Sequence, residues 1–399
     1  MRELPDFDAI RPYRDDEAAA VITRLCRDPD LRRAAAVFFM PRFARLLPEL
    51  AQTLVGRYVA VKTGHIHTVR DVQRWLTRHM ARIINDSTDA LDVTGLQHLK
   101  RDVPYLFISN HRDIVMDSAL LNFALHQAGF ETTRTAVGDN LFTLPCAADL
   151  MRLNKSFVVQ RRVTGAKALL KAVSLTSAYI RHSLEEGVSV WIAQREGRAK
   201  DGYDSTDAAV LKMLALAWRD GDSGMRAFVE NVRIVPVSVS YELDACDLRK
   251  AHELCVAAET GRYIKAPDED LRSMLQGIVG YKGRVHLAFG APFTGPECSA
   301  RGRCSDYGDA DALAAALDAE IARGLRLYPT HVDAAARVGA EIPAAARAQS
   351  GGVPAPNPRV MAAWQNRLAQ CPGAERPYLI ASYANIVRNV SDHLAEVVA

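Results

Sequence analysis

Residues 104–122 read P-Y-L-F-I-S-N-H-R-D-I-V-M-D-S-A-L-L-N, and the fold prediction depends on this stretch. The apolar run at residues 105–108 follows Pro104 and is too short for a helix, so it predicts a buried strand. Residues 116–124 carry apolar side chains at helical spacing, which predicts a helix. We therefore expect a strand that leads through a polar turn into a helix.

His111 lies in that turn, where the predicted strand ends. Open α/β sheets bind their ligands at the carboxyl ends of parallel strands. The carboxylate of Asp113 or Asp117 could fix the tautomer of the imidazole and stabilise its protonated form. This arrangement suits His111 to take a proton from a hydroxyl. A histidine near two aspartates is also common without any catalytic role, so the stretch alone leaves both interpretations open.

The composition is that of an ordinary globular protein. The chain has 399 residues, 49% of them hydrophobic and 24% charged, which is enough for two or three domain-sized units. A net charge of +3 is too small to indicate nucleic-acid binding. The seven cysteines include no C-x-x-C pair, which predicts reduced, mostly buried thiols in a cytoplasmic protein.

Several classes of protein lose support from motifs that the sequence lacks. The N-terminus, M-R-E-L-P-D-F-D, does not resemble a signal peptide, and no run of about 18 uncharged apolar residues predicts a membrane-spanning helix. The patterns G-x-S-x-G, G-x-G-x-x-G and the P-loop are absent. His65 and His67 have no further ligand set near them, so no metal site is predicted.

Between residues 91 and 300, strand patterns alternate with helix patterns. This alternation predicts an α/β domain with a mixed, largely parallel sheet flanked by helices. The predicted strands are residues 106–109, 134–137, 156–159, 188–193, 234–240 and 285–289. The predicted helices among them are residues 118–128, 145–153, 166–185 and 207–217.

The flanking regions read as helical. Residues 1–90 form a predicted helical N-terminal region, and residues 301–347 a helical extension. Residues 348–358 are rich in glycine and proline and predict a linker. Residues 359–399 predict a helical tail of two short amphipathic helices.

Residues 31–62 mix phenylalanine and leucine with arginine, and Pro41 and Pro48 must divide this stretch into separate helices. Apolar side chains beside arginines are typical of a helix that lies on an anionic membrane surface. A helix packed on the main domain, with its arginines reaching solvent, would show the same composition. The sequence leaves the two open.

Three further segments place charged groups at the ends of predicted strands. Residues 154–162 end in Arg161 and Arg162, and guanidinium groups bind phosphate bidentately. Residues 190–202 end in a charged turn, E-G-R-A-K-D-G, whose glycine permits close backbone approach. Residues 233–241 contain V-P-V in an apolar strand pattern. Each segment alone is more often a solvated edge than a site.

Taken in order, these four blocks resemble the glycerolipid acyltransferase superfamily, whose members acylate glycerol 3-phosphate and lysophosphatidic acid. That superfamily has a strand followed by N-H-x4-D, a second block that ends in arginine, a third block E-G-x-R and a V-P-V-like strand. The resemblance covers roughly residues 91–295 and includes G-A-P-F at residues 290–293.

The resemblance implies transfer of an acyl group from a thioester to the hydroxyl of a glycerol-phosphate-type acceptor in phospholipid biosynthesis. Acyl-CoA or acyl carrier protein would be the co-substrate, with no other cofactor and no metal. His111 would act as general base, held by Asp117 or Asp113. The implied substrate-binding residues are Asn110, Arg112, Arg161, Glu196, Gly197, Arg198 and Lys200, of which Arg161, Arg198 and Lys200 would hold the phosphate.

Two departures from the family pattern affect these expectations. Five residues separate His111 from Asp117, where the family has four, so either a local bulge brings Asp117 round or Asp113 is the partner. The third block is one residue shorter than the E-G-G-R-S-R-T-G form. A catalytically inactive protein that binds lipid phosphates or a membrane surface, or an O-acyltransferase for a non-glycerol lyso-lipid, would share the fold. Amphiphilic substrates also imply a cytoplasmic protein bound peripherally to the inner face of the membrane.

Overall fold

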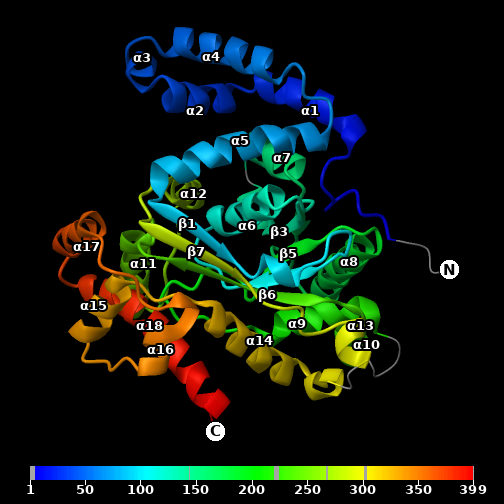
Figure 1. The fold of residues 1–399 in the computed structure, drawn as a ribbon. Coiled ribbons are helices and arrows are strands. Elements are labelled where there is room, and N and C mark those ends of the chain that lie inside the picture. Colours follow the sequence, from blue (N-terminus) through cyan, green and yellow to red (C-terminus); the bar gives the residue numbers. More distant parts are fainter. Residues whose placement is uncertain (1–4, 143, 220–223, 267, 301–302, 399) are drawn as a thin grey trace. The chain divides into compact units, whose positions relative to one another are not determined.

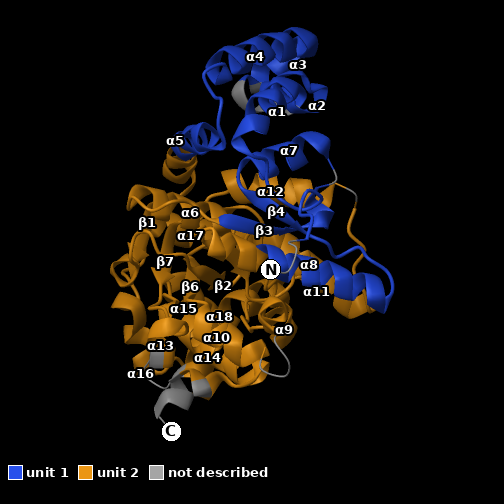
Figure 2. Cartoon of the chain, turned by 90° about the vertical axis from the view of Figure 1, so that its right-hand side faces the viewer, with its two compact units in different colours: residues 1–79, 134–179 blue, residues 80–133, 180–399 orange. Residues whose placement is uncertain are grey.

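The computed structural model describes residues 5–142, 144–219, 224–266, 268–300 and 303–398. The chain divides into two compact units (Figure 2). Residues 1–79 and 134–179 form the first, and residues 80–133 and 180–399 form the second. This division does not follow the linear domain boundaries expected from the sequence, which stay a prediction.

Five neighbouring strands of the sheet lie in the second unit, in the order β1 (Ala90–Thr94), β7 (Arg284–Phe289), β6 (Ile234–Tyr241), β2 (Leu106–Ser109) and β5 (Val190–Ala193). The pairs β1–β7, β2–β6 and β2–β5 are parallel, and only β6–β7 is antiparallel. The predicted fold class, a mixed and largely parallel sheet flanked by helices, is therefore confirmed. β1 was not predicted.

Helices cover this sheet and extend beyond it (Figure 1). They are α6 (Met116–Gln127), α9 (Ala208–Ala215), α10 (Gly224–Asn231), α11 (Asp247–Thr260), α12 (Glu269–Val279), α13 (Pro296–Ala300), α14 (Ala310–Gly324), α15 (Pro329–Arg337), α16 (Ala344–Ala348), α17 (Pro358–Gln370) and α18 (Arg376–Val398). The 3₁₀ turns are η1 (Leu96–His98), η3 (Leu216–Trp218), η4 (Arg303–Tyr307) and η5 (Gln349–Gly351). The prediction of two short tail helices is wrong for α18, which runs for 23 residues because its apolar face packs along most of its length.

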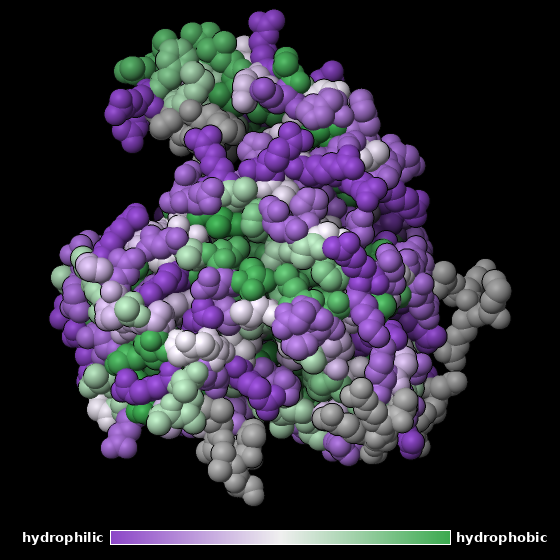
Figure 3. Space-filling model, in the orientation of Figure 1, coloured by the Kyte–Doolittle hydropathy of each residue, from purple (hydrophilic) through white to green (hydrophobic). Residues whose placement is uncertain are grey.

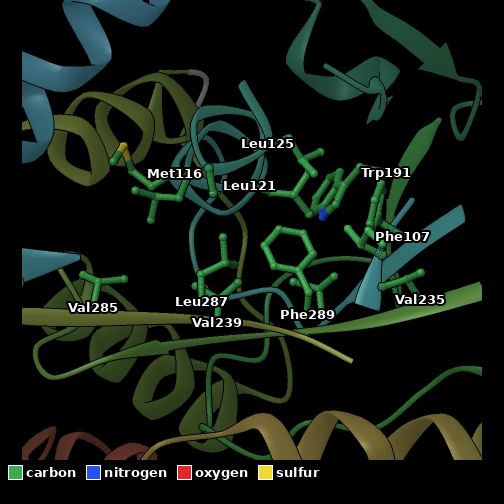
Figure 4. Packing of buried hydrophobic residues seen from close by; sticks show 14 of the residues in the cluster. Phe107, Met116, Leu121, Leu125, Trp191, Val235, Val239, Val285, Leu287 and Phe289 are labelled. Carbon is green, nitrogen blue, oxygen red and sulfur yellow. The ribbon is translucent and has the colours of Figure 1, made fainter. Parts of the chain in front are cut away.

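The core of the second unit fixes α6 against the sheet (Figure 4). Met116, Leu121 and Leu125 of α6 are buried in one cluster with strand side chains. Phe107 of β2 and Phe289 of β7 meet edge to face in the same cluster, with ring centroids 5.8 Å apart. Each such side chain contributes about 1.5–3 kcal/mol when fully buried. This packing holds the start of α6 beside the end of β2.

The C-terminal helices have a core of their own within the second unit. Trp364 of α17 and Tyr383 of α18 are buried, with ring centroids 4.5 Å apart. Leu243, which follows β6, is buried in the same cluster. The tail is therefore anchored beside the end of β6.

The first unit contains α1 (Asp15–Arg27), α2 (Pro29–Phe39), α3 (Pro41–Leu46), α4 (Pro48–Thr63), β3 (Arg134–Gly138), η2 (Asp139–Leu141), α7 (Pro145–Leu153) and β4 (Ser156–Val159). Helices α5 (Val69–Ser87) and α8 (Ala166–Glu185) begin in it and end in the second unit. β3 and β4 pair in parallel. Prolines occupy the first position of α2, α3 and α4, where no backbone N–H is required, so they divide this stretch as predicted.

One face of α3 and α4 is apolar and exposed (Figure 3). We call it the α3–α4 row, and its members are Leu46, Leu47, Leu50, Leu54, Tyr58 and Val61, each at least 45% exposed. Ala51 and Val55 on the same helix are buried against α2, so the row is the face that does not pack there. The side chains of Phe38 and Phe39, in the stretch for which the sequence left membrane contact and packing on the main domain open, lie outside the described residues. Among the described helices, none is both long enough and apolar enough to cross a bilayer.

Candidate active site

The polar turn after β2 leads directly into α6. Asp113 Oδ1 accepts the backbone N–H groups of Val115 and Met116, each at 2.9 Å. These bonds satisfy two of the donors that a helix leaves free at its start. Burial raises the pKa of Asp113, and the nearby charge of Asp117 raises it further. Asp113 therefore acts as a cap for α6.

Asp117 is the partner of His111. Its Oδ2 lies 2.8 Å from His111 Nδ1 and also accepts the backbone N–H groups of Arg112 at 2.6 Å and Asp113 at 2.9 Å. The Asp117 side chain is completely buried. The extra residue lies in the turn, and the first turn of α6 brings the carboxylate back to the histidine. Of the two aspartates that the sequence left open, the geometry selects Asp117.

Tyr241 completes the surroundings of this carboxylate. Its hydroxyl donates to Asp117 Oδ1 at 2.8 Å. Burial, with the charge of Asp117, raises the pKa of Tyr241 well above its ordinary value, so the phenol remains a donor. Sequence reasoning missed this residue, although it ends the fourth block. Its position opposite Asp117 depends on the register between β2 and β6.

Nε2, the other ring nitrogen of His111, can contact a substrate. A carboxylate at Nδ1 favours the tautomer with a proton on Nδ1, which leaves a lone pair on Nε2. The His111 side chain is 14% exposed. The ring of Trp191 stands edge-on to it at 5.8 Å and is held by a bond from its Nε1 to Ser109 Oγ at 3.0 Å. The imidazole of His111 is thus oriented by Asp117 on one side and packed against Trp191 on another.

Asn110 and Arg112 are buried and bond within the protein. Arg112 Nη2 donates to Asp204 Oδ2 at 2.6 Å and to the Gly202 carbonyl at 3.0 Å. Asn110 donates to Asp204 Oδ2 at 3.1 Å and accepts from Val239 N–H at 2.8 Å. These contacts favour a structural role for both side chains. Their contact with a substrate stays a prediction, and sequence reasoning missed Asp204.

Residues 194–207, between β5 and α9, carry the third block, and we call them the β5–α9 loop. The Ala199 N–H donates to the His111 carbonyl at 2.9 Å, so the loop is bonded to the turn that carries His111. Glu196 and Gly197 are exposed, and Gly197 has φ +75°, a conformation that favours glycine.

Arg198 and Lys200 differ in how available their charged groups are to bind an anion. Arg198 Nη1 is buried and has no hydrogen-bond partner in the described part of the chain. Lys200 forms an ion pair with Glu253 of α11. Burial alone would raise the pKa of the Asp244 carboxyl. The charge of Lys250 and, to a smaller extent, the charge of Arg198 instead lower that pKa below its ordinary value. Arg198 is therefore the better placed of the two cations to bind an anion.

Arg161 belongs to the first unit, where it follows β4. Its guanidinium lies close to Gly138, where an added Cβ would stand 3.0 Å from Arg161 Nε. Its part in a phosphate site stays a prediction. No cluster of three or more potential metal-binding side chains occurs among the described residues.

Comparisons with known proteins relate this chain to acyltransferases. Residues 90–240 match the family model described as Acyltransferase. The chain is 26% identical over 335 residues to plsB1 of Mycobacterium tuberculosis and of Mycobacterium bovis, which carry a provisional description as acyltransferases. The match covers 82% of this chain and 48% of theirs, so the chain spans about half the length of the curated relatives it matches.

Among solved structures, the chain has some similarity to the 1-acyl-sn-glycerophosphate acyltransferase PlsC of Thermotoga maritima. The two are 15% identical with a TM-score of 0.38, over 78% of this chain and 95% of that one.

Proposed function

We propose that the protein moves a fatty acyl group from a thioester to the hydroxyl of a glycerol-phosphate-type acceptor, since residues 90–240 match the Acyltransferase family model and the comparisons support the glycerolipid acyltransferase superfamily. The observation that carries this proposal is the bond between His111 Nδ1 and the buried Asp117 carboxylate. It supplies an oriented imidazole with Nε2 available as a base.

The reaction needs no covalent enzyme intermediate. His111 Nε2 takes the proton of the acceptor hydroxyl as its oxygen attacks the thioester carbonyl carbon. The tetrahedral intermediate collapses, the carbon–sulfur bond breaks, and the thiolate leaves with the proton from the imidazolium. Asp117 stabilises that imidazolium, and Tyr241 holds Asp117 in place. A base positioned in this way typically contributes about 10²–10⁴-fold in rate.

Arg198 would hold the phosphate of the acceptor. Its guanidinium has a buried nitrogen without a partner in the described residues, and its loop is bonded to His111. Anchoring the phosphate would convert an encounter in solution into a positioned attack. Lys200 would join Arg198 only by leaving Glu253, and Arg161 remains a further candidate.

The α3–α4 row would bring the protein to its substrates. Its exposed leucines could enter the interface of a bilayer, and Arg42, Arg45 and Arg57 are exposed beside them. Each arginine near an anionic surface adds about 1 kcal/mol of attraction. We therefore propose a cytoplasmic enzyme held peripherally on the inner face of the membrane.

An acyl-transfer assay with purified protein tests the proposal. The donors are acyl-CoA and acylated carrier protein, and the acceptors are glycerol 3-phosphate, 1-acylglycerol 3-phosphate and a lyso-lipid without glycerol phosphate. We expect transfer to a phosphate-bearing acceptor and its loss in His111→Ala. His126→Ala, an exposed histidine at the end of α6, is the matched control and should retain wild-type turnover.

The other outcomes identify the alternatives. Transfer only to the lyso-lipid without glycerol phosphate would keep the His111 chemistry and replace the acceptor. Binding of phosphate-bearing lipids with no product from any donor would indicate an inactive binding protein. Unchanged turnover in His111→Ala would contradict the mechanism.

A further inference from the structure

The C-terminal helix α18 contacts the β5–α9 loop through side chains on one face. Asn389 Nδ2 donates to the Asp204 carbonyl at 2.7 Å, and Asn385 Nδ2 donates to the Asp201 carbonyl at 2.9 Å. One turn further on, Asp392 accepts a hydrogen bond from the Tyr203 hydroxyl at 3.0 Å. Asn389 is 1% exposed, so its bond to the loop is shielded from water.

Gly202 allows the two backbones to meet. It has φ +80°, and a Cβ added to it would lie 1.7 Å from the carbonyl oxygen of Ser382 in α18. No side chain fits there unless the helix or the loop moves. The glycine of the third block thus permits direct packing of the loop on α18.

The opposite side of the same short segment bonds to the catalytic turn. Arg112 donates to the Gly202 carbonyl and to the Asp204 carboxylate, and Ala199 donates to the His111 carbonyl. Residues 199–204 are therefore held between the turn that carries His111 and the helix α18. Arg198 directly precedes this segment in the sequence.

We propose that α18 is a positioning element for acceptor binding: it sets the distance between Arg198 and His111 by fixing residues 201–204. This inference rests on the proposed function, because it assigns Arg198 to the acceptor phosphate. α18 lies outside residues 90–240, which match the family model, so the matched domain does not contain all of the groups that shape its site.

Asn389→Ala removes one donor to the loop without touching the His111 pair. The probe substrates are glycerol 3-phosphate, or 1-acylglycerol 3-phosphate if that is the acceptor used, with acyl-CoA or acylated carrier protein. We expect the KM for the acceptor to rise roughly tenfold, because the loss of one buried hydrogen bond corresponds to about a tenfold change in an equilibrium constant. The kcat and the KM for the donor should stay near wild type. Ser391→Ala, whose hydroxyl bonds to the Val387 carbonyl of α18 itself, is the matched control.

A double-mutant cycle separates positioning from general loosening of the fold. In an Arg198→Met background the additional Asn389→Ala change should no longer raise the KM for the acceptor, because the cation that it positions is absent. If Asn389→Ala does not fold, the half-buried Asn385→Ala carries the same test with the same expected increase in KM.

An unchanged KM for the acceptor in the folded variants would overturn the role of α18. So would an equal increase for donor and acceptor, or full additivity with Arg198→Met. Each of these results is compatible with an active acyltransferase. Wild-type protein that transfers no acyl group to any acceptor would instead contradict the proposed function itself.

Discussion

Replacing Asp117 by asparagine tests the central contact of the site. Oδ2 of Asp117 receives three donors, from His111 Nδ1 and two backbone N–H groups, and Oδ1 receives the Tyr241 hydroxyl. The amide oxygen of an asparagine can still accept the three donors, and its NH₂ group would then face a hydroxyl that can accept. The shape of the turn should therefore survive, while the negative charge is lost.

Loss of that charge should lower turnover strongly. In the proposed mechanism, Asp117 stabilises the imidazolium that forms when His111 takes the acceptor proton, and it fixes the tautomer that leaves Nε2 free. The same substitution beside a catalytic histidine in serine proteases lowers kcat about 10⁴-fold, so we expect a decrease of roughly 10³–10⁴-fold. Hydrogen bonds to a charged group are worth about 1.5–3 kcal/mol each, so some loss of thermal stability should accompany it.

Asp113→Asn is the matched comparison. Its oxygen can keep both bonds to Val115 and Met116, so the cap of α6 remains. We expect turnover within roughly tenfold of wild type, because Asp113 capping acts on the helix rather than on the imidazole. The assay is kcat with saturating donor and acceptor, below the unfolding temperature of both variants. A larger loss in Asp113→Asn than in Asp117→Asn would refute the assignment of Asp117.

Three further predictions follow from the site and the surface. Tyr241→Phe should lower kcat roughly tenfold with little change in either KM, since it removes one hydrogen bond from Asp117; unchanged kcat would deny Tyr241 a positioning role. Burial lowers the pKa of His286 from 6.5 to about 4, so between these pH values the unfolded state binds more protons and the free energy of unfolding falls as the pH falls. The full shift corresponds to roughly 3 kcal/mol of that free energy. In urea unfolding between pH 7 and pH 4, the free energy of unfolding of His286→Asn should decline less steeply than that of the wild type. Leu50→Ser with Leu54→Ser should weaken salt-sensitive co-sedimentation with anionic vesicles without lowering the unfolding temperature, as both side chains are exposed; wild-type protein that stays in the supernatant at low salt would exclude membrane binding through this row.

The elements whose signals are local could be predicted from the sequence. β2, β4, α7 and α8 have the predicted boundaries because each combines a continuous apolar or amphipathic pattern with a clear break. The short turn between β2 and α6 could also be foreseen. The choice between Asp113 and Asp117 could not, because one additional residue in a turn changes which carboxylate reaches His111.

Sequence reasoning missed the features that depend on contacts between segments far apart in the chain. β1, with the sequence A-L-D-V-T, is short and partly polar, and its pairing with β7 lies almost 200 residues away. The bond from Tyr241 to Asp117 spans 124 positions and depends on the register of two parallel strands. The internal bonds of Asn110 and Arg112 involve Asp204, which no motif singled out. Sequence patterns singled out His111 and the two aspartates as candidates, but not the contacts that orient them.

The contact between Asn389 and Asp204 also has a consequence for the order of events on the ribosome. The two residues are 185 positions apart, so at 5–20 residues per second α18 is made roughly 10–40 s after the loop that it holds. During that interval the nascent chain can already contain the strand and turn that carry His111, but the support for residues 201–204 is still being synthesised. The proposed base therefore emerges early in translation, and the proposed positioning of Arg198 is completed only when α18 emerges.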